Sequence, residues 1–116
     1  MADGIVKEKS KEFALRVVKL YKFLCDSKKE YVMSKQLIKC GTSIGANICE
    51  ADNSMSKKEF IAKMNISLKE AAETEYWLEL LYKSEYLEKD EYNSIVRDCG
   101  EIKALLISII KTSNRN

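Results

Sequence analysis

Apolar residues recur at steps of three and four along most of this chain, the spacing that places them on one face of a helix. Four such stretches, separated by short polar segments, predict helices over about residues 7–28, 34–53, 56–85 and 88–111. Their expected core positions are Phe13, Val17, Leu20 and Leu24; Leu37, Gly41, Ile44, Ile48 and Ala51; Phe60, Met64, Ser67, Ala71, Thr74, Leu78 and Leu81; and Tyr92, Ile95, Cys99, Ile102, Leu106 and Ile109. Short connections favour antiparallel neighbours. The pattern predicts an all-α protein, an antiparallel up-down-up-down four-helix bundle in which residues 1–116 form a single domain.

Local signals mark where these helices begin and where one of them packs closely. Ser34 is the expected N-cap of the second helix. Ser56 and Glu59 have the spacing of a capping box at the start of the third. Gly100 lies inside the fourth helix, where glycine costs about 1 kcal/mol in propensity, so we expect a close contact there.

The predicted second helix has few charges for a surface helix. Between residues 36 and 51 only Lys39 and Glu50 are charged. Beside the core stripe lies a second apolar stripe, made of Ile38, Gly45 and Cys49. A helix that is apolar nearly all round is buried nearly all round. One small bundle does not cover such a helix by itself, so we predict that the protein assembles with copies of itself.

Gly41 and Gly45 form a small-x3-small pattern on this helix, which lets two helix backbones approach closely. The pattern fits close packing inside one chain, and it also fits packing against another subunit.

Composition supports the helical prediction and narrows the class of protein. The chain is 46% apolar, has no proline and has only four glycines, which disfavours a turn-rich β fold. No apolar run approaches the ~20 residues of a membrane-spanning helix. The early lysines, at 7, 9 and 11, do not fit a signal peptide. We therefore expect a cytoplasmic protein without membrane contact. The four cysteines form no Cys-x-x-Cys pair and there is no histidine, so we expect buried, unligated thiols and no metal site.

The net charge is only +2, but it is unevenly distributed. Residues 1–39 carry ten Lys or Arg against five Asp or Glu, whereas residues 40–116 carry ten against thirteen. A basic segment of this kind is a candidate phosphate-binding surface, and a solvated helix face is the alternative. The candidate nucleic-acid contacts are Lys7, Lys9, Lys11, Lys19, Lys22, Lys28, Lys29 and Lys35.

Polar stripes run beside the apolar ones. They consist of Gln36, Ser43, Asn47 and Glu50, and of Glu70, Glu73 and Trp77. If these stripes face each other, Arg16 and Asn47 are expected to hydrogen-bond the three glutamates, because a buried charge must be paired. Together with Gly41 and Gly45, these residues are candidates for an oligomer interface or a buried polar network. Trp77 itself is expected in the core beside Leu78.

Several blocks of the chain together resemble a known family. They are Ser34-Lys-Gln-Leu, Gly41-Thr-Ser-Ile-Gly-Ala-Asn-Ile, Glu50-Ala51, Ser56 with Phe60, and Lys69-Glu-Ala-x-Glu-Thr-x-Tyr76-Trp77-Leu78. The chain resembles the four-helix bundle family encoded by intervening sequences in bacterial 23S ribosomal RNA genes, to which the accessory variability determinant of diversity-generating retroelements is related. The resemblance implies a ring-like homopentamer and supplies no catalytic residues. It also implies nucleic-acid contact, which the retroelement relatives make through a surface more basic than that of this chain.

These observations predict a non-enzymatic, oligomeric bundle without a cofactor, which serves as an interaction module and binds structured RNA or DNA weakly through a basic face. Two alternatives remain open. One is a protein-only adaptor or scaffold. The other is a small carboxylate-based metal protein or enzyme that uses Glu50, Glu70 and Glu73.

Overall fold

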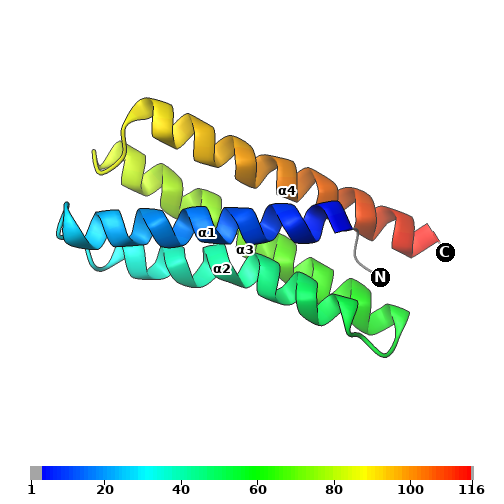
Figure 1. The fold of residues 1–116 in the computed structure, drawn as a ribbon. Coiled ribbons are helices and arrows are strands. Elements are labelled where there is room, and N and C mark those ends of the chain that lie inside the picture. The colour runs from blue at the N-terminus through cyan, green and yellow to red at the C-terminus, as the bar shows by residue number, and fades with distance from the viewer. Residues whose placement is uncertain (1–3, 116) are drawn as a thin grey trace.

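Four antiparallel helices form the molecule in the computed structural model, which describes residues 4–115. They are α1 (Gly4–Asp26), α2 (Met33–Asp52), α3 (Lys57–Lys83) and α4 (Lys89–Arg115). Each helix runs opposite to the one before it and packs against its neighbours in a bundle of 47 × 21 × 19 Å (Figure 1). Residues 1–3 and 116 of the predicted domain lie outside the described range. The all-α, up-down-up-down prediction is confirmed.

The core lies along the four inward faces that the apolar spacing predicted. All the expected core residues of the first three helices are buried, and α1 adds Val6 and Ser10. In α4, Tyr92 and Ile109 are only half-buried, and Ile110 takes the inner position instead. The step of four from Leu106 to Ile110 keeps that side chain on the core face, since three and four residues both approximate one turn.

The start of α2 differs from the prediction that Ser34 is its N-cap. Helix α2 begins one residue earlier, and Ser34 is buried with its hydroxyl donating to the carbonyl oxygen of Glu30 at 2.8 Å. The cap is the Glu30 carboxylate. Its oxygens accept from the backbone N–H groups of Val32 at 3.1 Å, Met33 at 3.0 Å and Ser34 at 2.7 Å. One carboxylate therefore satisfies three donors that the helix leaves unpaired, and its charge suits the positive end of the helix dipole.

The Ser56 half of the predicted capping box at α3 is confirmed, whereas the Glu59 half differs by one residue. The Ser56 hydroxyl oxygen accepts from the backbone N–H of Glu59 at 3.1 Å. The Glu59 carboxylate reaches back to the N–H of Met55 at 2.9 Å, one residue before the cap. The short turn between α2 and α3 is fixed from both sides in this way.

The glycines of α2 pack against α1, whereas Gly100 does not pack closely. A Cβ at Gly41 would lie 2.9 Å from a methyl carbon of Val17, and one at Gly45 would lie 3.2 Å from the Ser10 hydroxyl oxygen. A Cβ at Gly100 would meet nothing within 4 Å, so the expected close contact there is wrong. The small-x3-small pattern therefore brings α1 and α2 together within one chain.

Alanine substitutions at these glycines should act in opposite directions. We expect Gly41→Ala to destabilise the protein by about 1–3 kcal/mol, because the β-branched Val17 is stiff and the added methyl overpacks the contact. We expect Gly100→Ala to stabilise it by roughly 0.5–1 kcal/mol through helix propensity alone. Urea denaturation of both variants beside the wild type measures the two changes. A loss of stability at Gly100→Ala would contradict the open surroundings of that residue.

Candidate functional site

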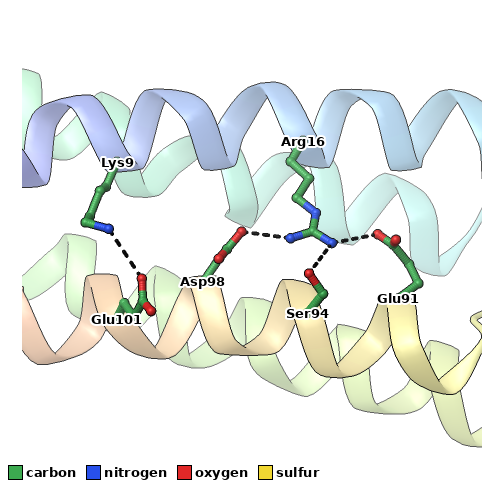
Figure 2. A network of polar contacts seen from close by, with 6 residues as sticks. All are labelled: Lys9, Arg16, Glu91, Ser94, Asp98 and Glu101. Carbon is green, nitrogen blue, oxygen red and sulfur yellow. Dashed lines mark hydrogen bonds and ion pairs between the residues drawn. The ribbon is translucent and has the colours of Figure 1, made fainter.

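Two of the eight candidate lysines are neutralised by acidic neighbours. Lys7 forms an ion pair with Asp52 of α2 at 2.5 Å. Lys9 lies 3.3 Å from the Glu101 carboxylate of α4 (Figure 2). These two residues thus hold α1 against its neighbours, and they contribute less to a basic surface than the sequence suggested.

Five other lysines lie on the second half of α1, in the turn that follows it and at the start of α2. This group, called the basic end below, consists of Lys19, Lys22, Lys28, Lys29 and Lys35. Two of them, Lys19 and Lys28, line a surface pocket together with Glu85, Glu88 and Glu91. All five are exposed, and within residues 4–115 none forms an ion pair. The Lys28 ammonium lies 5.8 Å from the centre of the Phe23 ring. The remaining candidate, Lys11, is exposed further along α1.

Arg16 pairs with α4, which corrects the predicted pairing with glutamates of α2 and α3. Its guanidinium donates to Asp98 at 2.7 Å, to Glu91 at 3.1 Å and to the Ser94 hydroxyl at 2.9 Å (Figure 2). Helices α1 and α4 pack least closely of the four neighbouring pairs, so long polar side chains bridge them.

A signal for this contact was present in the sequence. On α4 the residues Glu91, Ser94, Asp98 and Glu101 follow one another at steps of three, four and three. On α1 the two cations Lys9 and Arg16 are two turns apart. Matching stripes of opposite charge on the first and last helices of a bundle indicate that those helices are neighbours.

The two polar stripes of α2 and α3 do lie on neighbouring flanks, but in the described part of the chain Asn47 does not join them in a shared network. Its side-chain amide donates to the Ser43 carbonyl of the same helix at 2.8 Å. The Ser43 hydroxyl in turn donates to the Lys39 carbonyl at 2.7 Å. Within residues 4–115, the one ion pair across this flank joins Glu50 to Lys63 at 2.8 Å. Gln36 is exposed at the start of the stripe.

Trp77 is half-buried, so its predicted place in the core is wrong. Its neighbour Leu78 holds the fully buried position, and a step of one residue turns Trp77 about 100° away from it. The indole N–H donates to the Glu73 carboxylate at 3.0 Å. Two further apolar side chains of α3, Ile66 and Tyr76, are 40% and 54% exposed.

Glu70 and Glu73 form an acidic pair beside the indole. Burial raises the pKa of Glu70, the nearby Glu73 charge raises that pKa further, and Lys39 opposes the change. Within residues 4–115 neither carboxylate forms an ion pair. Glu70 and Glu73, together with the half-buried Trp77, therefore form a strip on α3 that is anionic and partly apolar.

The metal-protein alternative finds no support in this arrangement. In the part of the chain that the structure describes, no three His, Cys, Asp or Glu side chains lie close enough together to hold a metal ion.

Burial raises the pKa of the Cys40 thiol to about 11 and that of Cys99 to about 12. Cys25 is half-buried and Cys49 is exposed, so the expectation that every cysteine is buried is wrong for Cys49.

A groove of about 650 Å³ runs between α1 and α2 on the surface. It is lined by Gly4, Lys7, Glu8, Ser10, Lys11, Ala14, Thr42, Gly45, Ala46 and Cys49. Helix α2 is therefore not buried nearly all round within one chain. Ile38 and Gly45 of the second stripe are half-buried, whereas Cys49 and the adjacent Ala46 are exposed.

The fold and its surfaces define an all-α bundle with three features. The α2 side of the α1–α2 groove carries no charged residue, α3 carries an acidic strip, and exposed lysines form the basic end. The chain belongs to the 23S rRNA-intervening sequence protein family, whose sequence profile matches residues 2–108. A solved structure from Bacteroides thetaiotaomicron, a protein with unknown function from the S23 ribosomal protein family, is 60% identical to this chain. The similarity has a TM-score of 0.94 and covers 96% of this chain and 99% of that one. A search of curated proteins found no match. Within residues 4–115 no helix is long and apolar enough to cross a membrane.

Proposed function

We propose that this protein is a non-enzymatic, self-assembling bundle that serves as an interaction module. The observation that carries this proposal is the uncovered side of α2. Residues 40–49 contain no charged side chain, yet Ala46 and Cys49 are exposed beside the α1–α2 groove. Apolar side chains that are exposed beside a groove support an interaction site there. A second copy of the chain is the simplest partner, and the family resemblance favours five copies.

Size-exclusion chromatography with light scattering tests the assembly. We expect a mass near five times the 13.3 kDa of one chain, and the mass should persist on dilution to low micromolar concentration. A particle of 13.3 kDa at micromolar concentration would contradict the proposal.

We further propose that the basic end contacts the phosphates of structured RNA or DNA. Five exposed lysines without ion pairs in the described range support it. Each subunit alone supplies a weak, sequence-independent contact, since phosphate binding depends on counterion release. Several subunits that reach one strand multiply that contact through effective concentration. A protein-only adaptor is the alternative outcome, in which nucleic acid does not bind at all.

Charge reversal at the basic end tests this contact. The double variant Lys19→Glu, Lys22→Glu should bind an RNA hairpin or a DNA duplex more weakly, with unchanged oligomer mass. The slope of log K against log salt on duplex DNA should fall by about 0.9 for each phosphate that the variant no longer neutralises. The matched control is Lys57→Glu, Lys58→Glu, because these exposed lysines begin α3, and the start of α3 lies at the end of the bundle opposite the α1–α2 turn (Figure 1). Equal decreases in affinity for both variants, or tight binding that persists at about 0.5 M salt, would contradict a contact at the basic end.

A further inference from the structure

We propose that the α1–α2 groove of one copy receives the α3 strip of the next copy, so that the chain assembles head to tail through two different faces. The strip, called the acidic ridge below, consists of Ile66, Glu70, Glu73 and Trp77. This inference rests on the self-assembly proposed above and assigns the surfaces that carry it.

The acidic ridge is a single row of side chains along one side of α3, and a narrow row of this kind fits into a groove. Its residues follow one another at steps of four, three and four, so they lie along one side of α3. The large side chains Ile66 and Trp77 stand at its two ends, and the carboxylates of Glu70 and Glu73 lie between them. Ile66 is 40% exposed and Trp77 is half-buried, so both retain apolar surface that a partner can cover.

The groove has the complementary shape. The residues that line it include the small ones Ala14, Thr42, Gly45 and Ala46. Small side chains let a neighbouring helix approach closely, and they leave room for a large one such as an indole. Large residues on the ridge and small residues in the groove are the combination that packs two helical surfaces without voids.

The charges are also complementary. Lys11 lines the groove and is exposed. Lys7 also lines the groove, and its side chain is 42% exposed beside its ion pair with Asp52. Among residues 4–115, Glu8 is the one acidic residue that lines the groove. The ridge offers two carboxylates that lack an ion pair within residues 4–115, and their mutual repulsion would be relieved by these cations.

The placement of the two faces explains the composition of α2. The groove lies on the α1 side of α2. The ridge lies on the flank of α3 next to α2, where the Lys39 charge acts to lower the pKa of Glu70. A contact between two different faces of one chain is heterologous, and it forms a closed ring when the rotation between subunits permits. Because the two faces share α2 as their common edge, α2 would point towards the centre of such a ring. Its uncharged run from 40 to 49 fits that position.

Two single substitutions and two matched controls test this assignment. Ala46→Arg blocks the groove, and Ile66→Arg blocks the ridge. The controls are Ala104→Arg and Ile107→Arg on α4, a helix that contributes residues neither to the groove nor to the acidic ridge. Ile107 is 39% exposed against 40% for Ile66, and both alanines are exposed. Light scattering should show monomers for the first two variants and the wild-type mass for both controls.

Mixing the two blocked variants gives the decisive result. The Ala46→Arg chain retains its ridge and the Ile66→Arg chain retains its groove, so an equimolar mixture should form a one-to-one dimer of twice the chain mass and nothing larger. A mixture that stays monomeric, a blocked variant that assembles like the wild type, or a control that dissociates would each overturn the assignment. In all three results the wild type still assembles, so the proposed function stands.

A monomeric wild type, by contrast, would overturn both the proposed function and this inference. Far-UV circular dichroism establishes that each variant is folded. Should Ala46→Arg or Ile66→Arg be unfolded, Cys49→Arg in the groove and Glu73→Arg on the ridge replace them under the same criteria, because both positions are exposed.

Discussion

Leu78→Ala should lower the free energy of unfolding by about 2–5 kcal/mol, the range for removing a buried leucine. Leu78 is fully buried among the apolar residues of all four helices. The loss combines the transfer free energy of the removed methyl and methylene groups with the cavity that remains. Urea denaturation in the monomeric Ala46→Arg background measures it, because no subunit interface then contributes to the free energy of unfolding.

Trp77→Ala is the informative comparison, since Trp77 adjoins Leu78 in sequence. A buried tryptophan costs about 3–5 kcal/mol on truncation. Here the indole is half-buried and hydrogen-bonded to Glu73 at the surface, so we expect only about 1–2 kcal/mol. A loss at Trp77 as large as that at Leu78 would contradict the half-exposed position of the indole within one chain.

Glu30→Ala should destabilise the protein by about 2–4 kcal/mol, because it leaves the three backbone donors at the start of α2 without their acceptor. The contrast is Glu59→Ala at the start of α3. Glu59 is exposed and accepts from one backbone donor, so about 0.5–1 kcal/mol is expected there. Equal losses in the two variants would show that the buried cap contributes no more than an exposed one.

The cap should also make stability depend on pH. Burial acts to raise the pKa of Glu30, but the backbone N–H groups of Met33, Ser34 and Val32 outweigh it and hold the pKa below its usual value. A carboxyl whose pKa is lower in the folded state stabilises the fold above its unfolded pKa of about 4.3. That stabilisation is lost as the pH falls from there through the folded pKa.

Glu30→Gln isolates this dependence, because glutamine does not titrate. The difference in unfolding free energy between wild type and Glu30→Gln should be constant above about pH 5 and should shrink as the pH falls below about 4.3. A difference that is the same at pH 3 and pH 6 would contradict the role of the ionised carboxylate.

The sequence by itself determined the four helices and nearly every core position. Apolar spacing near the helical period identifies the inward face of each helix without reference to its neighbours, as Phe13, Met64 and Leu78 show. The Ser56 half of the capping box was predictable for the same reason, since all of its atoms belong to one short segment. Local patterns suffice when the interaction itself is local.

Only the tertiary structure decided what lies on the flanks. The spacing of residues within a helix identifies its inward face but does not show which neighbouring helix lies beside each flank. Arg16 was therefore expected near α2 and α3, but it pairs with Asp98 of α4. A shift of one residue turns a side chain by about 100°, which separates half-buried Trp77 from buried Leu78. Glu30 became a cap because the turn after α1 folds its carboxylate onto the start of α2. Each outcome depends on how the helices are placed in space, and helix placement is set by the packing of the whole core.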